Sequence, residues 1–206
     1  MNPRWLLDHG VEHESHLEKR FIMVALSCPV VVDIVHQPLQ LTLGYEDGTT
    51  EKYTPDFKVT FRDQSSTIVE VKPRVFVEKH RRKLDQAKKQ LEAEGQAFDV
   101  ITDTEIDANG LSARALLLMR YARMQFSDQD AAEWMRLLNE ECSGSAEVRA
   151  LVEKGANEAL IWNMVARHQF RIPIGINVTA QETVSINTIE GDLHVYFLQW
   201  FGIEAR

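Results

Sequence analysis

Residues 53–74, YTPDFKVTFRDQSSTIVEVKPR, decide how the first half of the chain folds. Apolar and polar residues alternate over 57–61, which predicts a strand with one buried face. A polar turn at 63–66 follows, and the β-branched run 67–71 predicts a second strand beside the first. Pro55 cannot donate a hydrogen bond to a sheet, so it marks the entry of the first strand or an edge.

The charged residues of this stretch predict a metal site. Glu70 and Lys72 lie two apart in a strand and project from one face, while Asp56 heads the neighbouring strand. Converging carboxylates repel each other unless a positive charge lies between them. Mg²⁺ meets this need, because it binds one or two carboxylates together with carbonyl and phosphate oxygens. We therefore expect Asp56, Glu70 and the backbone carbonyl of Val71 to bind Mg²⁺, for which Mn²⁺ would substitute.

The same residues indicate phosphodiester hydrolysis. Lys72 would orient a metal-activated water or stabilise the charge that develops on a phosphate. Glu18, on a helix that precedes the strands, would add a carboxylate, and Glu14, one helical turn earlier, is the alternative. A Glu-x-Lys pair alone is more often a solvated strand face. Combined with Pro-Asp and a capped helix that carries Glu, it favours a metal-dependent nuclease with one metal ion or two.

The surrounding elements predict an α/β domain with a mixed sheet. Ser15 and Glu18 form a capping box that starts a helix over 14–27. A second helix is expected over 75–95, closed by Gly95. Strands, in a meander, are predicted at 30–35, 39–43, from Lys52 to 61, at 67–71 and at 98–102. Because the second helix makes a crossover, the last two strands are expected to be parallel.

The turn at 107–110 predicts a boundary between two domains, 1–108 and 109–206. The second domain shows helical patterns at 111–124, 128–141, 145–154 and 157–168, and β-prone runs at 171–178 and 182–189. Small helices followed by a possible hairpin favour a winged-helix-like fold. The apolar segment 191–206 is expected to pack in the core rather than to form a docking surface for a partner.

The charge pattern predicts weak DNA binding by the chain alone. The net charge is -8, whereas proteins that hold DNA tightly are generally basic. One dense basic cluster follows the candidate site and consists of Lys72, Arg74, Lys79, Arg81, Arg82, Lys83, Lys88 and Lys89. We expect its members Arg74, Lys79, Arg82 and Lys83 to contact DNA phosphates, although a solvated helix face is the alternative.

Other features set the expected location and exclude further sites. No run of eighteen apolar residues or signal-peptide layout occurs, so we expect a cytoplasmic protein without a membrane segment. Cys28 and Cys142 are too few and too far apart for a disulfide framework or a metal site. The histidines at 9, 13 and 16 lack a second ligand cluster and favour a solvated surface.

The motifs resemble a known nuclease family. YTPDF and IVEVKP are similar to the PD-(D/E)xK superfamily, and the longer pattern resembles TnsA, the endonuclease subunit of heteromeric transposases. The longer pattern consists of ESHLEKRF, DIVHQPLQL, YTPDFKV, IVEVKP and FDVITDTEI. The resemblance implies a restriction-endonuclease-like domain followed by a winged-helix region. It also implies that Glu18, Asp56 and Glu70 are the catalytic, metal-binding acids and Lys72 is the catalytic lysine. Some family members have Gln at the position of Glu70.

The resemblance implies a role in cut-and-paste transposition. In the family this subunit cleaves the 5′ ends of the transposon, and an RNase H-like transposase cuts and joins the 3′ ends. An ATP-dependent transposition regulator couples both to target choice, by a DNA-binding protein or an RNA-guided complex. A free-standing resolvase or restriction-type nuclease is the first alternative. The second is an inactive adaptor that binds DNA ends or the regulator, which the complete set of four site residues disfavours.

Overall fold

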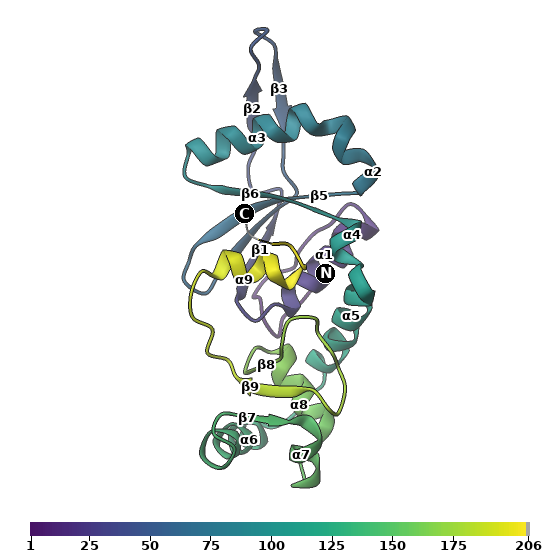
Figure 1. Ribbon diagram of the computed structural model, residues 1–206, viewed down its shortest axis with the longest axis vertical. Coiled ribbons are helices and arrows are strands. Elements are labelled where there is room, and N and C mark those ends of the chain that lie inside the picture. Colours follow the sequence, from purple (N-terminus) through teal and green to yellow (C-terminus); the bar gives the residue numbers. More distant parts are fainter. Residues whose placement is uncertain (205–206) are drawn as a thin grey trace.

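A four-stranded mixed sheet forms the centre of the first half of the chain (Figure 1). The computed structural model describes residues 1–204, so the last two residues of the predicted second domain lie outside it. The strands, in spatial order, are β1 (Val31–His36), β4 (Phe57–Phe61), β5 (Ser66–Lys72) and β6 (Ala97–Thr102). β4 runs antiparallel to β1 and β5, whereas β6 runs parallel to β5. The predicted mixed sheet and its parallel crossover are thereby confirmed.

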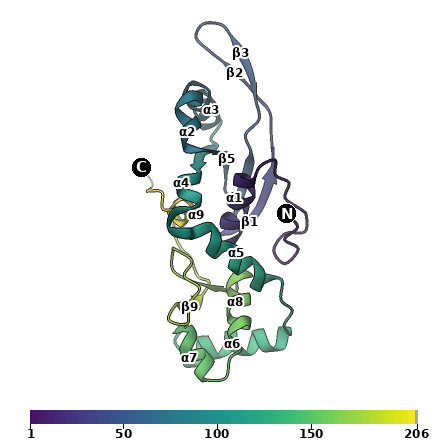
Figure 2. The ribbon, with the colours of Figure 1, turned by 90° about the vertical axis from the view of Figure 1, so that its right-hand side faces the viewer.

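The chain between β1 and β4 leaves this sheet as a separate hairpin. β2 (Leu41–Gly44) and β3 (Thr50–Tyr53) form their own two-stranded sheet, which projects from one end of the molecule (Figure 2). The prediction of one strand from Lys52 to Phe61 was wrong. Pro55 lies in the break between β3 and β4, where it cannot donate to a ladder. The strands are therefore not a sequential meander, because β1 pairs with β4.

Helices cover both faces of the sheet. α1 (His16–Ser27) lies on one face and α3 (Arg81–Ala93) on the other (Figure 1). The helix predicted from residue 75 is broken, because α2 (Arg74–Val77) and the 3-10 helix η1 (Glu78–His80) precede α3. Gly95 ends α3 with a φ of 75°, a left-handed conformation that glycine adopts readily, as the sequence predicted.

The alternation along β5 divides the apolar core into two layers. Val69 and Val71 pack in the main cluster, which includes Phe21 of α1. Ile68 faces the other way and packs in a smaller cluster with Leu84 of α3. Residues two apart in a strand share a face, so the side chains of Glu70 and Lys72 project on the α3 side.

The second half consists of helices around a small sheet. α4 (Asp103–Ile106) and the 3-10 helix η2 (Ala108–Gly110) lead into it from the first half. Its helices are α5 (Leu111–Ala122), α6 (Asp128–Glu141), α7 (Val148–Glu153), α8 (Glu158–Ala166) and α9 (Leu193–Trp200). Its strands are β7 (Ser145–Glu147), β8 (Phe170–Arg171) and β9 (Thr183–Ile186), in the antiparallel order β7-β9-β8. The helix predicted from residue 145 starts as β7 instead. None of the described helices is long and apolar enough to span a membrane.

The two halves share one hydrophobic core. α5 packs against α1, and the main apolar cluster contains residues of both halves. α9 returns to the sheet, where Phe197 lies 5.4 Å from Phe61 between ring centroids. Trp200 Nε1 donates to Ser27 Oγ of α1 at 3.2 Å. Within the described part of the C-terminal segment, α9 therefore packs in the core, as expected.

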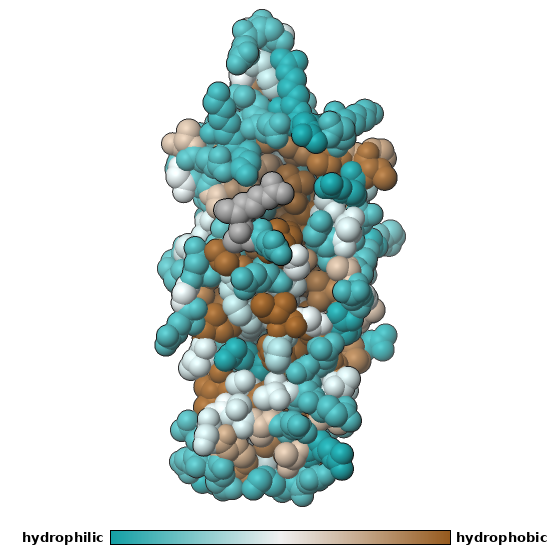
Figure 3. Space-filling model, viewed as in Figure 1, coloured by the Kyte–Doolittle hydropathy of each residue, from teal (hydrophilic) through white to brown (hydrophobic). Residues whose placement is uncertain are grey.

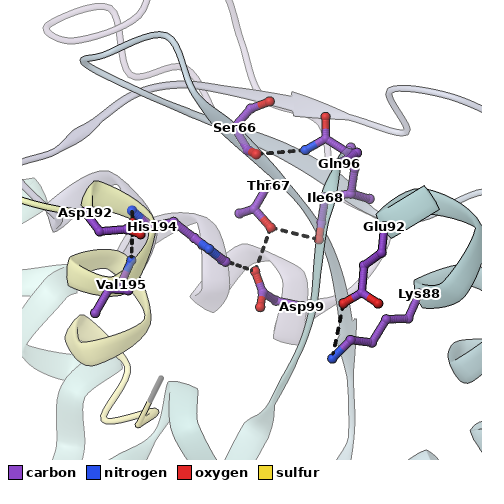
Figure 4. A network of polar contacts seen from close by, with 10 residues as sticks. All are labelled: Ser66, Thr67, Ile68, Lys88, Glu92, Gln96, Asp99, Asp192, His194 and Val195. Carbon is purple, nitrogen blue, oxygen red and sulfur yellow. Dashed lines mark hydrogen bonds and ion pairs between the residues drawn. The ribbon is translucent and has the colours of Figure 1, made fainter. Parts of the chain in front are cut away.

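A polar network fixes the start of α9 against the sheet (Figure 4). His194 Nε2 lies 2.7 Å from Asp99 Oδ2 of β6, and Thr67 of β5 donates to the same oxygen at 2.6 Å. The hydrogen bond with Asp99 raises the pKa of His194. Asp192 caps the helix by accepting from the backbone N–H groups of His194 and Val195. The helix is thus oriented by specific contacts as well as by apolar packing.

Substitution of Phe197 by Ala tests whether α9 belongs to the core of the first half. The ring is fully buried, so its removal should lower the free energy of unfolding by about 3–5 kcal/mol. Urea denaturation would measure the loss. Gln199→Ala, on the exposed side of the same helix, is the control and should change stability little. A Phe197→Ala variant as stable as the control would contradict the shared core.

Candidate active site

Asp56, Glu70 and Lys72 meet where β4 begins and β5 ends. Asp56 Oδ2 accepts from the backbone N–H of Val71 at 2.7 Å, so this side chain joins the two strands. Lys72 Nζ lies 2.7 Å from Glu70 Oε1. The backbone of Asp56 is held as well, because its carbonyl accepts from the N–H of Gln37 at 2.8 Å. The predicted convergence of two carboxylates and one ammonium is thus present.

Glu18 lies in the first turn of α1 with its carboxylate almost fully buried. Its Oε1 accepts from Ser15 Oγ and its Oε2 from the backbone N–H of Glu14, both at 2.7 Å. Its negative charge is also among the causes that raise the pKa of Asp56. The Glu14 side chain is exposed and binds Gln37 instead. Of the two candidates, the structure places Glu18 next to the site.

The electrostatics of the site favour a bound cation. Burial and the negative charges of Glu70 and Glu18 together raise the pKa of Asp56 to about 7, although the hydrogen bond from the Val71 N–H and the charge of Lys72 oppose the shift. A shift in this direction means that ionising Asp56 is costly without a compensating positive charge. Lys72 offsets part of the excess, but it is one ammonium among three carboxylates.

The donor set fits Mg²⁺ with two protein carboxylates. No group of three His, Cys, Asp or Glu side chains within residues 1–204 is arranged to hold a metal ion. In a sheet the N–H and C=O of one residue point to the same neighbour, so the carbonyl of Val71 faces the Asp56 side. Asp56, Glu70 and this carbonyl would leave the other positions to water and phosphate, which is usual for Mg²⁺.

Sequence reasoning missed two further residues of the site. Tyr53, the last residue of β3, donates to Glu70 Oε2 at 2.6 Å, and burial followed by the Glu70 charge raises its pKa. His36 Nε2 is buried, lacks a hydrogen-bond partner within the described chain, and lies 3.9 Å from Glu18 Oε2. Two features of the sequence could have indicated these residues. Tyr53 is the first residue of the stretch 53–74, and His36 lies two residues after the buried Ile34.

The four predicted DNA-binding residues divide into two pairs. Arg82 and Lys83 of α3 form ion pairs with the hairpin, at 2.6 Å to Asp47 and 2.5 Å to Glu51. Their contacts hold the hairpin against the helix. Arg74 and Lys79 are exposed beside the site and form no ion pair among residues 1–204. Arg74 and Lys79 are therefore better placed to meet a phosphate.

The mixed sheet, the helices on its two faces and the acidic edge with a lysine fit the α/β nuclease class. Residues 28–103 match the family model described as "TnsA-like endonuclease N terminal". This region is therefore similar to the N-terminal domain of TnsA-like endonucleases, which confirms the resemblance seen in its motifs. The matched region contains Tyr53, Asp56, Glu70 and Lys72, whereas Glu18 precedes it. A comparison with curated proteins found no match to the chain.

The raised pKa of Asp56 predicts a pH-dependent stability in metal-free buffer. The folded protein binds this proton more tightly than the unfolded chain, whose Asp pKa is near 3.8. The contribution to stability is therefore complete below about pH 4 and is lost as the pH rises through about 7. Urea denaturation from acid to mildly alkaline pH should show this loss in the native protein. Asp56→Asn should remove it.

The difference between the two profiles isolates Asp56, because the two proteins differ at that position alone. Asp63→Asn, an exposed carboxylate in the turn before β5, is the matched control and should keep the native profile above pH 5. Parallel profiles for the native protein and Asp56→Asn would contradict the raised pKa.

Proposed function

We propose that this chain is a Mg²⁺-dependent DNA endonuclease subunit of a heteromeric transposase. It cleaves the 5′ ends of a transposon during cut-and-paste transposition, in the cytoplasm. The observation that supports this most directly is the cluster of Asp56, Glu70 and Lys72 within the TnsA-like nuclease domain. The DNA substrate would be a transposon end.

The proposed metal site uses Asp56, Glu70 and the carbonyl of Val71, with Glu18 as a further carboxylate. Bound Mg²⁺ would supply Lewis-acid stabilisation of a phosphate and a lowered pKa for a water molecule, and Mn²⁺ would substitute. Both oxygens of Glu70 are fixed, one by Lys72 and one by Tyr53. Both oxygens of Glu18 are fixed by the start of α1. The acids are thus held in place before substrate arrives.

We propose that Lys72 stabilises the negative charge that develops on the phosphate. Its ammonium is part-buried and held at 2.7 Å from Glu70 Oε1, on the α3 face of the sheet. Its three N–H donors allow it to keep this contact and still donate to a phosphate oxygen or to the attacking water. Lys72 would therefore orient the reacting groups and stabilise the transition state.

Residues 109–206 are proposed as a winged-helix-like unit for partner binding. The order α6-β7-α7-α8-β8-β9 with a three-stranded sheet supports that fold. In helix-turn-helix proteins the second helix reads the major groove. Here that helix, α8, is buried from Leu160 to Ala166, so it has little surface for DNA.

The charge of this unit supports protein rather than DNA partners. Residues 128–158 contain eight carboxylates and three cations. Each cation is paired, as Arg136 with Glu140, Arg149 with Glu153, and Lys154 with Glu141. Such a surface repels phosphate. We propose that it serves the RNase H-like transposase and the ATP-dependent regulator, which would bring the DNA to the nuclease domain.

Cleavage of end-containing DNA in Mg²⁺ or Mn²⁺ tests the proposed activity. The protein should nick the 5′ ends when transposase and regulator are present. Asp56→Asn should lower the rate by at least about 100-fold, because it removes a metal ligand. Asp63→Asn is the matched control and should cleave normally. Robust cutting without partners would favour a free-standing nuclease, and the absence of Asp56-dependent cutting would favour an inactive adaptor.

Tyr53→Phe tests the support of Glu70 without changing a proposed ligand. Loss of the hydroxyl frees one Glu70 oxygen, so the Mg²⁺ concentration for half-maximal cleavage should rise by about 10-fold or more. Tyr45→Phe is the matched control, because the Tyr45 hydroxyl binds Glu51 on the exposed hairpin, away from the site. An unchanged metal requirement in Tyr53→Phe would show that Glu70 needs no such support.

A further inference from the structure

The helix that follows the active site exposes apolar side chains. Val75 is 78% exposed and Phe76 is 49% exposed, the two highest values for large apolar residues in the described chain. Both lie on α2, which begins directly after Lys72 and Pro73. Apolar residues at the outer end of α2 form a patch near the hairpin end of the molecule (Figure 3). Exposed neighbouring apolar groups mark a surface that is covered in a complex.

The α2 segment is held in position rather than frayed. Pro73 fixes the backbone before it, and its carbonyl accepts from the N–H of Phe76 at 2.9 Å. The N–H of Arg74 donates to Asp103 Oδ1 of α4 at 2.6 Å. The two apolar side chains are thus presented to solvent by an anchored turn of helix, which favours a function for their exposure.

The charges around α2 identify the chemistry of the partner. Four cations of the nearby helix α3 are neutralised by carboxylates, in the pairs Arg81–Glu78, Arg82–Asp47, Lys83–Glu51 and Lys88–Glu92. Arg74 and Lys79, which flank the apolar pair, form no ion pair within residues 1–204 and are exposed. An apolar tip between two free cations complements bases between two phosphates.

We propose, on the basis of the nuclease function above, that α2 is a DNA wedge. Arg74 and Lys79 bind phosphates that flank the cleaved bond, and Phe76, supported by Val75, inserts between adjacent base pairs. Phe76 lies four residues from Lys72, so the Cα atoms of the two residues are at most about 14 Å apart, and the wedge would act a few base-pair steps from the cleaved bond. Apolar wedges of this kind unstack a step and bend the duplex. The opened step would present the scissile strand to the acidic site.

A duplex in which one base-pair step is already unstacked distinguishes insertion of Phe76 from simple phosphate binding. Anisotropy titrations of the full chain in EDTA would compare a matched duplex with the same duplex carrying a central mismatch. The native protein should prefer the mismatched duplex by about 10-fold, because unstacking there costs less. Phe76→Ser should reduce this preference to within about 2-fold, because no ring remains to insert.

Two comparisons complete the experiment. Arg74→Ala with Lys79→Ala should weaken binding to both duplexes equally and lower the salt slope by about 2, since two phosphate contacts are lost. Val152→Ser, an exposed apolar residue on α7, is the matched control and should leave the preference native. Thermal melting of each variant checks that the exposed substitutions leave the fold intact.

The outcomes separate the wedge from the proposed function. If the Phe76→Ser variant keeps the native preference for the mismatched duplex and still cleaves DNA, the wedge is overturned but the proposed function is not. Loss of transposase binding in Phe76→Ser, with the DNA preference unchanged, would make α2 a protein-docking surface and also overturn it. A native protein without a preference for the mismatched duplex overturns the wedge. A native protein that also fails to cleave end-containing DNA in Mg²⁺, with transposase and regulator present, overturns the proposed function as well.

Discussion

The hydrogen bond from the Val71 N–H to the Asp56 carboxylate is the contact on which the site depends. Pro55 cannot donate to a ladder, so regular pairing between β4 and β5 stops there, and a side chain continues the connection. That side chain is an acid, and its position brings it next to Glu70. The same contact therefore joins two strands and creates the concentration of negative charge that a cation would relieve.

The surrounding structure holds this unfavourable arrangement in place. Tyr53 and Lys72 hold the two oxygens of Glu70, and Ser15 fixes Glu18 at the start of α1. These contacts order the acids and offset part of the cost of burying like charges. The apolar core supplies the compensating free energy, and α9 extends that core across the junction of the two halves. A rigid and charged site is thus supported by packing far from it.

The nuclease fold was predictable because its signals are local. Periodicity over 57–61 and 67–71, the capping residue Ser15 and the helical C-cap Gly95 each specify an element from a few neighbouring residues. The separation of the β2–β3 hairpin from the main sheet was not predicted, since the returning strand was expected to run on from Lys52 to Phe61. The short β7 was missed because its pairing with the distant β9 decided it, and the breaks before α3 were missed as well.

The sequence by itself determined the α/β class, the crossover and the acids that belong to the site, because strand periodicity dictates which side chains share a face. Only the tertiary structure decided which groups actually meet. Arg82 and Lys83 look like free cations in sequence, but the folded hairpin brings carboxylates to them. Tyr53 becomes a partner of Glu70 only when β3 folds beside β5. Ion pairs and buried hydrogen bonds join residues far apart in the chain, and their partners are fixed by packing rather than by local propensity.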